Sequence, residues 1–171
     1  VSARASCRLA EIRPGDVFHV WEPLYHIGGV EVMILALMEE LTLGMVERFS
    51  VSQFWRQVRE FKATHIHFLG GVLAMLLKEA PRPDDRDNTV RVAWGGGCPL
   101  QVWRAFEERF GVQIRECYGM TECSSFTTQN LTGKLGSTGK PLPFFEVRIA
   151  GENGEALGEG QRGEFWVKGK V

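Results

Sequence analysis

The sequence predicts an α/β fold: a doubly wound, mostly parallel sheet with helices on both faces, followed by a small antiparallel β region. Between residues 17 and 117, short apolar runs alternate with segments whose apolar residues recur every three or four positions. This is the pattern of right-handed βαβ units. After residue 123 the chain becomes rich in Ser, Thr, Gly and Asn, and two later segments alternate between polar and apolar residues, as antiparallel strands do.

Five strands and four helices are expected before residue 118. Gly44 weakens the second strand, because glycine offers no side chain to pack. Pro81 stops the third helix, Pro99 suits the first position of the fourth, and Gly111 closes it. The expected strands cover residues 17–21, 41–46, 65–69, 90–94 and 112–117. The expected helices cover residues 30–40, 52–61 (with a serine cap at 50 or 52), 73–80 and 99–110.

Helical spacing also predicts which side chains are buried. Residues 1–15 are polar and weakly periodic, with a turn at 13–15, and residues 81–88 form a charged surface loop. The core is expected to contain Met33, Phe54, Phe61, Phe106 and Phe110, and the first helix repeats apolar residues at Val30, Ile34, Leu37 and Met38.

The end of the chain predicts a second structural region. Residues 145–149 and 163–167 are the two alternating segments, with a turn region between them. We therefore expect residues 1–122 to form a parallel α/β subdomain and residues 123–171 a loop and antiparallel β region of the same domain. The chain begins at Val1 and ends just after a Gly-Glu-Phe-Trp-Val-Lys-Gly segment, so we interpret it as a piece of a longer protein.

Composition narrows the functional classes. The 171 residues are 44% hydrophobic and 24% charged, with a formal charge of −1, as in an ordinary globular protein without the basic excess of a nucleic-acid binder. The longest apolar run, residues 72–77, is too short to span a bilayer, and no signal peptide is visible. The four cysteines form no Cys-x-x-Cys pair, which favours reduced thiols and a cytoplasmic location.

A five-residue stretch, Tyr118 to Glu122, combines groups suited to a nucleotide. The Tyr118 ring offers a flat face to a base, and Gly119 lets the backbone approach a ligand closely. The Thr121 hydroxyl can donate to a phosphate oxygen, and the Glu122 carboxylate is a hard oxygen ligand of the kind that magnesium prefers. The stretch therefore predicts a nucleotide and metal site.

Four unusual loops follow expected strands and should meet along one edge of the sheet. In a doubly wound sheet, ligands bind at the carboxyl ends of the strands. By contrast, we interpret His65 and His67, on the third expected strand, as hydrogen-bonded packing residues and not as ligands of one metal ion. The four loops are residues 23–26, 70–71, 95–97 and 118–122.

These motifs together resemble the adenylate-forming enzymes, which include acyl-CoA synthetases, amino-acid adenylation domains and firefly-type luciferases. The matching segments are Tyr-Gly-Met-Thr-Glu at 118–122, Gly-Gly-Gly-Cys-Pro-Leu at 95–100, Pro-Leu-Tyr-His at 23–26 and Gly-Glu-Phe-Trp-Val-Lys-Gly at 163–169. These segments occur in the family's order and at its intervals, so the resemblance covers nearly the whole chain. Within the family the chain looks most like acyl-CoA ligases of the crotonobetaine/carnitine or fatty-acyl kind.

The resemblance implies a two-step reaction. A carboxylate attacks the α-phosphate of magnesium-bound ATP, giving an acyl adenylate and pyrophosphate, and the thiol of coenzyme A then takes the acyl group and releases AMP. Tyr118 would stack on adenine, Thr121 would contact the α-phosphate, and Glu122 would hold Mg²⁺. His26 would border the acyl pocket and act between the half-reactions. The base and acyl tunnel would be lined by Gly95, Gly96, Gly97, Glu116 and Cys117, with Gly119 and Met120 beside the nucleotide.

The chain lacks several of the family's other motifs. It has no upstream phosphate loop, no ribose-binding aspartate segment and no adenylation lysine, so we expect it not to turn over by itself. Two alternatives stay open: a non-catalytic nucleotide- or acyl-binding module, and an adenylation domain that loads a carrier-protein thiol. We also expect exposed apolar surface to favour a homo-oligomer.

Overall fold

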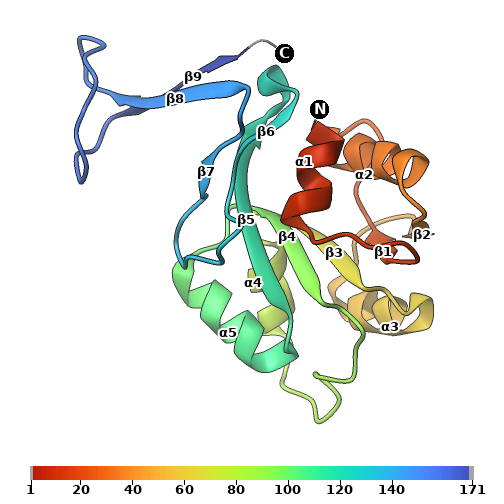
Figure 1. Cartoon of the computed structure of the whole chain (residues 1–171). Helices are drawn as coiled ribbons and strands as arrows, with labels where there is room; N and C mark the ends of the chain where they lie inside the picture. The colour runs from red at the N-terminus through yellow and green to blue at the C-terminus, as the bar shows by residue number, and fades with distance from the viewer. Residues whose placement is uncertain (1, 170–171) are drawn as a thin grey trace.

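The computed structural model describes residues 2–169, in which one seven-stranded sheet dominates (Figure 1). The helices are α1 (Ser2–Leu9), α2 (Ile27–Met38), α3 (Val51–Phe61), α4 (Val72–Lys78), α5 (Leu100–Phe110) and the 3₁₀ turn η1 (Thr121–Cys123). The strands are β1 (Val17–Val20), β2 (Thr42–Met45), β3 (His65–Leu69), β4 (Val92–Gly96), β5 (Gln113–Met120), β6 (Ser125–Gln129), β7 (Lys140–Pro141), β8 (Phe145–Ala150) and β9 (Glu164–Gly169).

The sheet confirms the predicted mostly parallel architecture. Its strand order is β2-β1-β3-β4-β5-β6-β7. The first five strands are parallel, while β6 and β7 pair antiparallel at one edge. The chain passes from β1 outward to β2 and then back to β3, so the order reverses between β1 and β3. Ligands of doubly wound sheets bind outside such a reversal point.

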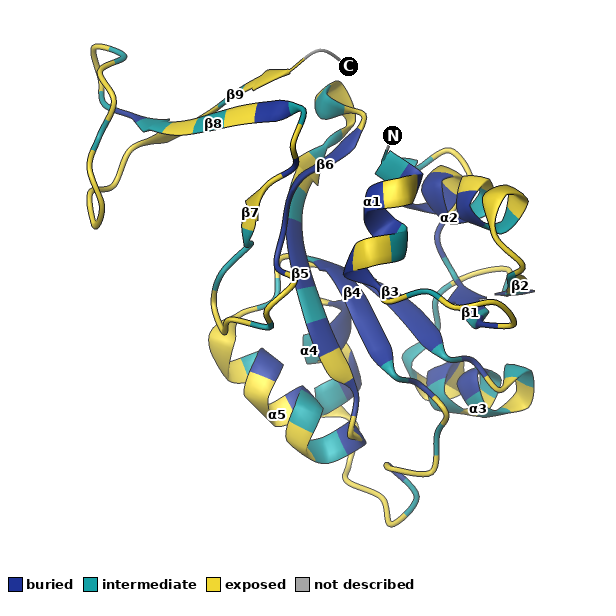
Figure 2. Ribbon diagram, viewed as in Figure 1, coloured by how far each residue is buried: buried dark blue, intermediate teal, exposed yellow. Residues whose placement is uncertain are grey.

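Helices cover both faces of the sheet, each over its own apolar core. One core joins α3, α4 and α5 to the sheet through side chains such as Phe54, Leu76 and Phe106. The other joins α1 and α2 to the opposite face and includes Leu35 and Trp94. The middle strands are buried on both sides in Figure 2, as expected for parallel strands between two helical layers.

Two elements differ from the sequence prediction. Residues 2–9 form helix α1, whose buried Ala3, Ala5 and Leu9 pack on α2 and β6; only tertiary packing stabilises so short a helix. Residues 125–129, expected to be loop, form the fully buried strand β6. Because β6 and β7 continue the sheet beyond residue 122, the division into residues 1–122 and 123–171 stays a prediction. Residues 1, 170 and 171 of the two predicted regions lie outside the described part of the chain.

The predicted buried face of α2 is wrong. The helix buries Val32 and Leu35, together with Gly28, Gly29 and Glu31. The residues expected to pack instead lie on the surface, because the helix is apolar nearly all round and its spacing cannot select one face. We call Val30, Ile34, Leu37 and Met38 the α2 patch; Leu37 is 85% exposed.

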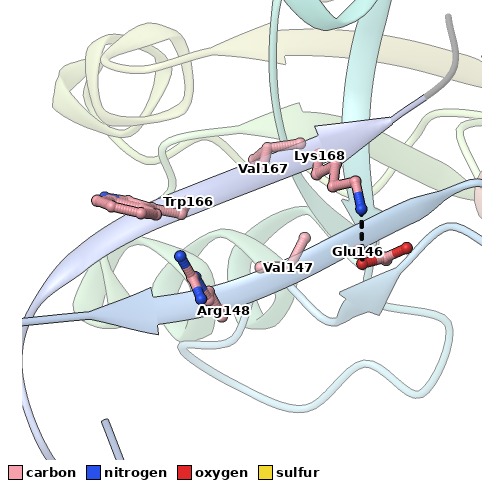
Figure 3. A pocket seen from close by; sticks show the side chains of 6 residues that line it. All are labelled: Glu146, Val147, Arg148, Trp166, Val167 and Lys168. Atoms are coloured by element: carbon pink, nitrogen blue, oxygen red, sulfur yellow. Dashed lines mark ion pairs between the residues drawn. The ribbon is translucent and has the colours of Figure 1, made fainter. Parts of the chain in front are cut away.

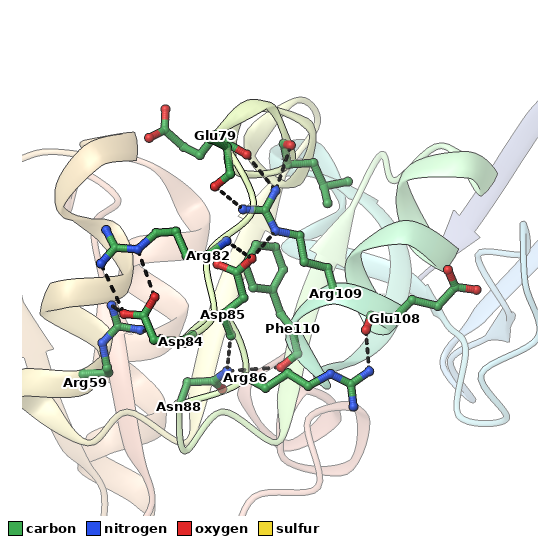
Figure 4. A network of polar contacts seen from close by, with 12 residues as sticks. Arg59, Glu79, Arg82, Asp84, Asp85, Arg86, Asn88, Glu108, Arg109 and Phe110 are labelled. Atoms are coloured by element: carbon green, nitrogen blue, oxygen red, sulfur yellow. Dashed lines mark hydrogen bonds and ion pairs between the residues drawn. The ribbon is translucent and has the colours of Figure 1, made fainter.

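The predicted charged loop of residues 81–88 is fixed by polar contacts (Figure 4). Arg109 of α5 donates to a carboxylate oxygen of Asp85 at 2.7 Å. The same guanidinium donates to the carbonyl oxygens of Leu77, Glu79 and Ala80, which lie at or just beyond the end of α4. Arg109 thus caps one helix from another, a role that the loop's composition did not reveal.

We expect Arg109→Met to lower the free energy of unfolding by about 2–3 kcal/mol, because it leaves the Asp85 carboxylate and three carbonyls short of a partner. Burial raises the pKa of Asp85, but the Arg109 hydrogen bond and the Arg82 amide outweigh it and hold that pKa below its usual value. Asp85 therefore stabilises the fold above about pH 4, and this contribution is lost as the pH falls through its lowered folded pKa.

Urea unfolding measured between pH 3 and pH 7 would test this expectation. Arg82→Met is the matched control, because the Arg82 side chain is 67% exposed in its ion pair and should change stability little. An Arg109→Met variant as stable as the unchanged chain at pH 7 would contradict the capping role.

The predicted antiparallel region is confirmed by β8 and β9, which pair over their whole lengths and project from the sheet (Figure 1). An isolated two-stranded hairpin is marginal in water. Phe145 and Ala150 are buried at the two ends of β8, and Val147 and Val167 pack against the second core. Among residues 2–169, no helix is long and apolar enough to cross a membrane.

Candidate functional site

A cavity of about 170 Å³ lies at the carboxyl ends of the central parallel strands. Its walls come from the start of α2, the ends of β3, β4 and β5, the 3₁₀ turn η1 and strand β6. The expectation that separate loops meet at one edge of the sheet is therefore confirmed in its main point. The lining residues are His26, Ile27, Gly28, Glu31, His67, Leu69, Trp94, Gly96, Cys117, Gly119, Met120, Thr121, Ser125 and Phe126.

Six of the residues singled out from the sequence line this cavity. His26 reaches it from the N-terminal cap of α2, where its Nδ1 accepts a hydrogen bond from the Gly28 amide at 3.1 Å. Capping the helix and bordering the cavity are therefore compatible roles for this one side chain. The other five are Gly96, Cys117, Gly119, Met120 and Thr121.

Residues 118–122 were predicted to form a loop, but most of this stretch is strand. β5 runs to Met120 and pairs antiparallel with β6, with an irregularity between Tyr118 and Gly119. The Tyr118 side chain does not line the cavity. Its ring instead lies 4.7 Å from that of Phe165 in β9, in an edge-to-face arrangement. Any base that stacks on Tyr118 therefore lies beside the cavity, near the β9 strand.

Gly119 is required by the protein's own packing. A Cβ atom at this position would lie 2.1 Å from the carbonyl oxygen of Ser125 and 2.2 Å from the Cα of Phe126. The close backbone approach predicted at Gly119 is therefore an approach of β5 to strand β6. It leaves the neighbouring Met120 and Thr121 at the mouth of the cavity.

Gly95 and Gly96 are the last residues of strand β4, and the chain turns toward α5 after them, at Gly97, where Glu116 braces it. Glu116 does not line the cavity; its Oε1 accepts hydrogen bonds from the amides of Gly97, at 2.6 Å, and Cys98, at 3.1 Å. Burial nevertheless raises the pKa of Glu116. A Cβ at Gly95 would lie 1.9 Å from the carbonyl oxygen of Phe68, so this glycine permits close strand packing. Only Gly96 of the three lines the cavity.

Thr121 and Glu122 lie exposed in η1, directly after β5. No hydrogen bond or ion pair occupies either side chain within residues 2–169. That region also holds no cluster of three metal-binding side chains. A single free carboxylate fits magnesium, which keeps several waters and uses one or two carboxylates plus substrate phosphates.

The thiols near the cavity are poor nucleophiles. Burial raises the pKa of the Cys117 thiol, which donates to the carbonyl oxygen of Gly95. Burial, followed by the charge of Glu116, raises the pKa of Cys98 to about 12. Because the thiolate is the reactive form, neither cysteine supports a covalent intermediate at neutral pH. All four cysteines are free, as predicted.

We expect iodoacetamide at pH 7.5 to leave Cys117 and Cys98 unmodified in the folded chain, because both thiols stay protonated. Peptide mass spectrometry after labelling, with and without urea, measures this directly. Cys123, which is partly exposed, serves as the internal comparison. Rapid native labelling of Cys117 would show that the cavity wall opens and would contradict the described burial.

Sequence reasoning missed the polar residues of the cavity wall. Glu31 is buried in α2, and its carboxylate accepts hydrogen bonds from the hydroxyls of Ser6 and Ser125. His67 is hydrogen-bonded, as predicted, but it also lines the cavity. A signal was available: Glu22 and Glu31 are lone acidic residues inside otherwise apolar segments, and buried carboxylates need partners.

A larger hollow of about 480 Å³ lies on the β8–β9 hairpin (Figure 3). The guanidinium carbon of Arg148 lies 4.6 Å from the ring centre of Trp166, and Lys168 pairs with Glu146 at 3.7 Å. These groups are exposed and none was predicted to bind a ligand. The hollow is an open strand surface, whereas the smaller cavity gathers buried polar side chains from α2, β3 and β6.

Comparison with known proteins gives concordant matches. A family model described as AMP-binding enzyme matches residues 1–171. Human long-chain fatty acid transport protein 1 is 37% identical over 152 residues, which are 85% of this chain and 23% of that protein. The mouse long-chain fatty acid transport protein 6 is 34% identical over 134 residues, or 77% of this chain and 22% of that protein. The chain thus spans about a quarter of the length of these relatives.

A solved structure shares the fold at moderate identity. O-succinylbenzoate coenzyme A synthetase from Bacillus subtilis, in complex with ATP and magnesium ion, matches with a TM-score of 0.80 and 30% identity. The match covers 98% of this chain and 36% of the synthetase chain.

Proposed function

This chain belongs to the AMP-binding enzyme family, and we propose that it supplies part of the active site of an ATP-dependent acyl-CoA ligase. The single observation that carries the proposal is the meeting of His26, Gly96, Cys117 and the residues 119–121 at one cavity beside an exposed carboxylate, Glu122. The synthetase with the similar fold was solved with ATP and magnesium ion, which supports nucleotide and metal at this edge of the sheet.

In the proposed reaction the chain's residues position charge and provide no nucleophile. Thr121 would donate its hydroxyl to the α-phosphate at the mouth of the cavity, and Tyr118 would hold the adenine beside it. The cavity behind, bordered by His26, would hold the acyl group of the acid, and coenzyme A would then take that group. Glu122 would hold Mg²⁺, which supplies positive charge to the phosphates. Such positioning and electrostatic stabilisation are what an adenylation step needs.

Binding of AMP tests the nucleotide part of this proposal. We expect calorimetry to detect AMP binding that Tyr118→Ala weakens about tenfold or more, because stacking of a base on an aromatic ring contributes roughly 1–3 kcal/mol. Trp166→Ala, an aromatic deletion on the hairpin away from the cavity, should leave AMP affinity unchanged. Loss of affinity in both variants, or in neither, would count against an adenine site at Tyr118.

The similar solved structure bears on which thiol accepts the acyl group. The structure matched at 30% identity is a coenzyme A synthetase, which favours coenzyme A over a carrier-protein thiol. A cytoplasmic location stays a prediction, as does the absence of turnover by these residues alone.

We further propose that the α2 patch brings two copies of the chain together. Its four apolar side chains lie on one helix next to β2, an edge strand of the sheet, and exposed apolar area of this kind favours association. Leu37→Glu should shift sedimentation toward monomer, whereas Met75→Glu, a change at an exposed methionine of α4, should not. A monomer for the unchanged chain across a wide concentration range would contradict the idea.

A further inference from the structure

A buried carboxylate–histidine pair joins β1 to β3 at the point where the strand order reverses. Glu22 is the second residue after β1, and its Oε1 is hydrogen-bonded to Nδ1 of His67 in β3. The two residues are only 5% and 6% exposed. The His67 ring also contacts Trp94 of β4, with a distance of 4.4 Å between ring centres. His67 and Trp94 both line the cavity.

The pair fixes which nitrogen of His67 is available to accept a further hydrogen bond. A carboxylate only accepts hydrogen bonds, so Nδ1 carries the proton shared with Glu22 and Nε2 keeps its lone pair. Within residues 2–169, Nε2 of His67 has no hydrogen-bond partner. In the same part of the chain, the indole Nε1 of Trp94 and Oε2 of Glu22 are buried without a partner.

The two buried atoms, Nε1 of Trp94 and Oε2 of Glu22, need an explanation, because a buried polar atom without a partner costs roughly 1–3 kcal/mol. Three of the other polar side chains of the cavity already make hydrogen bonds. Glu31 and Ser125 bond to one another, and Nδ1 of His26 accepts from the Gly28 amide. The proposed adenylation step already uses Thr121. An acceptor on His67 and a donor on Trp94, two rings that contact one another, thus have no partner among residues 2–169.

We propose that His67 and Trp94 recognise a hydroxyl group on the acyl chain of the activated acid. One hydroxyl can donate to Nε2 of His67 and accept from Nε1 of Trp94, so it satisfies both atoms at once. The rest of the wall, including Ile27, Leu69 and Phe126, suits the methylene groups. This inference rests on the proposed function, since it takes the cavity to be the acyl site.

The size of the cavity limits how much of the acyl chain it holds. About 170 Å³ holds roughly five or six groups of water size at about 30 Å³ each. The hydroxyl recognised here therefore lies within a short stretch of the acyl chain. Glu22 acts as a positioning residue that sets the tautomer of His67, a carboxylate's usual effect on an imidazole.

Matched acyl-sulfamoyl adenosines provide the test. In each pair, with acyl chains of four to six heavy atoms, a terminal methyl of one compound is replaced by a hydroxyl in the other. We expect at least one hydroxyl compound to bind about tenfold more tightly than its methyl partner, measured by calorimetry on the full 171-residue chain. A site built to bond a hydroxyl discriminates strongly against the analogue without it.

Substitutions locate the preference. His67→Phe and Trp94→Phe should each bring the affinity ratio of the pair close to one, whereas Glu22→Gln should keep it, because the amide oxygen still accepts from Nδ1. Phe126→Leu is the control: it alters an apolar wall residue, so both compounds should weaken equally. Thermal unfolding checks that each variant folds, and if His67→Phe does not, Trp94→Phe alone decides.

The outcomes separate this inference from the proposed function. Equal affinities within every pair, with AMP still bound, would overturn the hydroxyl site and leave the ligase proposal standing. A preference that persists in both His67→Phe and Trp94→Phe would also overturn it. Binding of neither AMP nor any adenosine compound would remove the proposed function, and the inference with it.

Discussion

Gly119→Ala is expected to lower the free energy of unfolding by about 3 kcal/mol, the high end of the cost of overpacking. The added methyl would meet the backbone of Ser125 and Phe126 at 2.1 and 2.2 Å, and backbone cannot rotate away as a side chain does. β5 and β6 must then separate where they form the cavity wall. Urea unfolding gives the stability change, and AMP titration of the folded fraction gives the change at the site.

Gly71→Ala is the matched control for that substitution. Gly71 has a helical backbone conformation, with φ −76°, and open space where a Cβ would be placed. Alanine there should be neutral or slightly stabilising, because it reduces the freedom of the unfolded chain. A Gly119→Ala variant as stable as Gly71→Ala would show that β6 does not pack against β5 as described.

Glu116→Ala is expected to cost about 2–4 kcal/mol and to loosen the turn at Gly97. The substitution leaves the part-buried amides of Gly97 and Cys98 without their acceptor, and each hydrogen bond to a charged group contributes roughly 1.5–3 kcal/mol, which water replaces in part. Glu116→Gln keeps an acceptor oxygen and should cost much less. We expect AMP affinity to fall more than stability alone explains, because the turn borders the site through Gly96.

The pH dependence of stability tests the burial of the Glu116 carboxyl, because the variants at residue 116 cannot ionise there. Burial raises the folded pKa of Glu116, so its ionised form is disfavoured in the fold. Stability from this group is fully present below the unfolded value, near pH 4.3, and is lost as the pH rises through the folded pKa. Glu116→Gln should remove that loss, so its stability relative to the unchanged chain should improve from pH 4 to pH 7. No change with pH would contradict the buried position of this carboxyl.

The sequence was sufficient for the parallel half of the fold. The strand His65–Leu69 is a short run that ends in Phe-Leu and is followed by two glycines, and Pro99 and Gly111 mark the ends of α5 as their backbone chemistry requires. Helix α1 and strand β6 were not predictable in this way. Their stability comes from contacts with α2 and β5 that are distant in sequence, and Ser-Thr-rich residues 123–130 give no local signal of burial.

The site was predicted in part for a similar reason. Loops after parallel strands must share an edge, so His26, Gly96 and Thr121 could be brought together from the sequence alone. Tyr118 and Glu116 were placed less well, since alternation along β5 turns successive side chains to opposite faces. The pairing of Glu22 with His67 depends on the β1–β3 register, which no local pattern specifies.

The most direct test of the central claim is calorimetric titration of the chain with a non-hydrolysable acyl-adenylate mimic. A single ligand then spans the Tyr118 side of β5 and the cavity beside it. We predict that the mimic binds more tightly than AMP, and that Tyr118→Ala and Thr121→Val each weaken it about tenfold. Absence of binding, or binding that neither substitution alters, would contradict an acyl-adenylate site at this edge of the sheet.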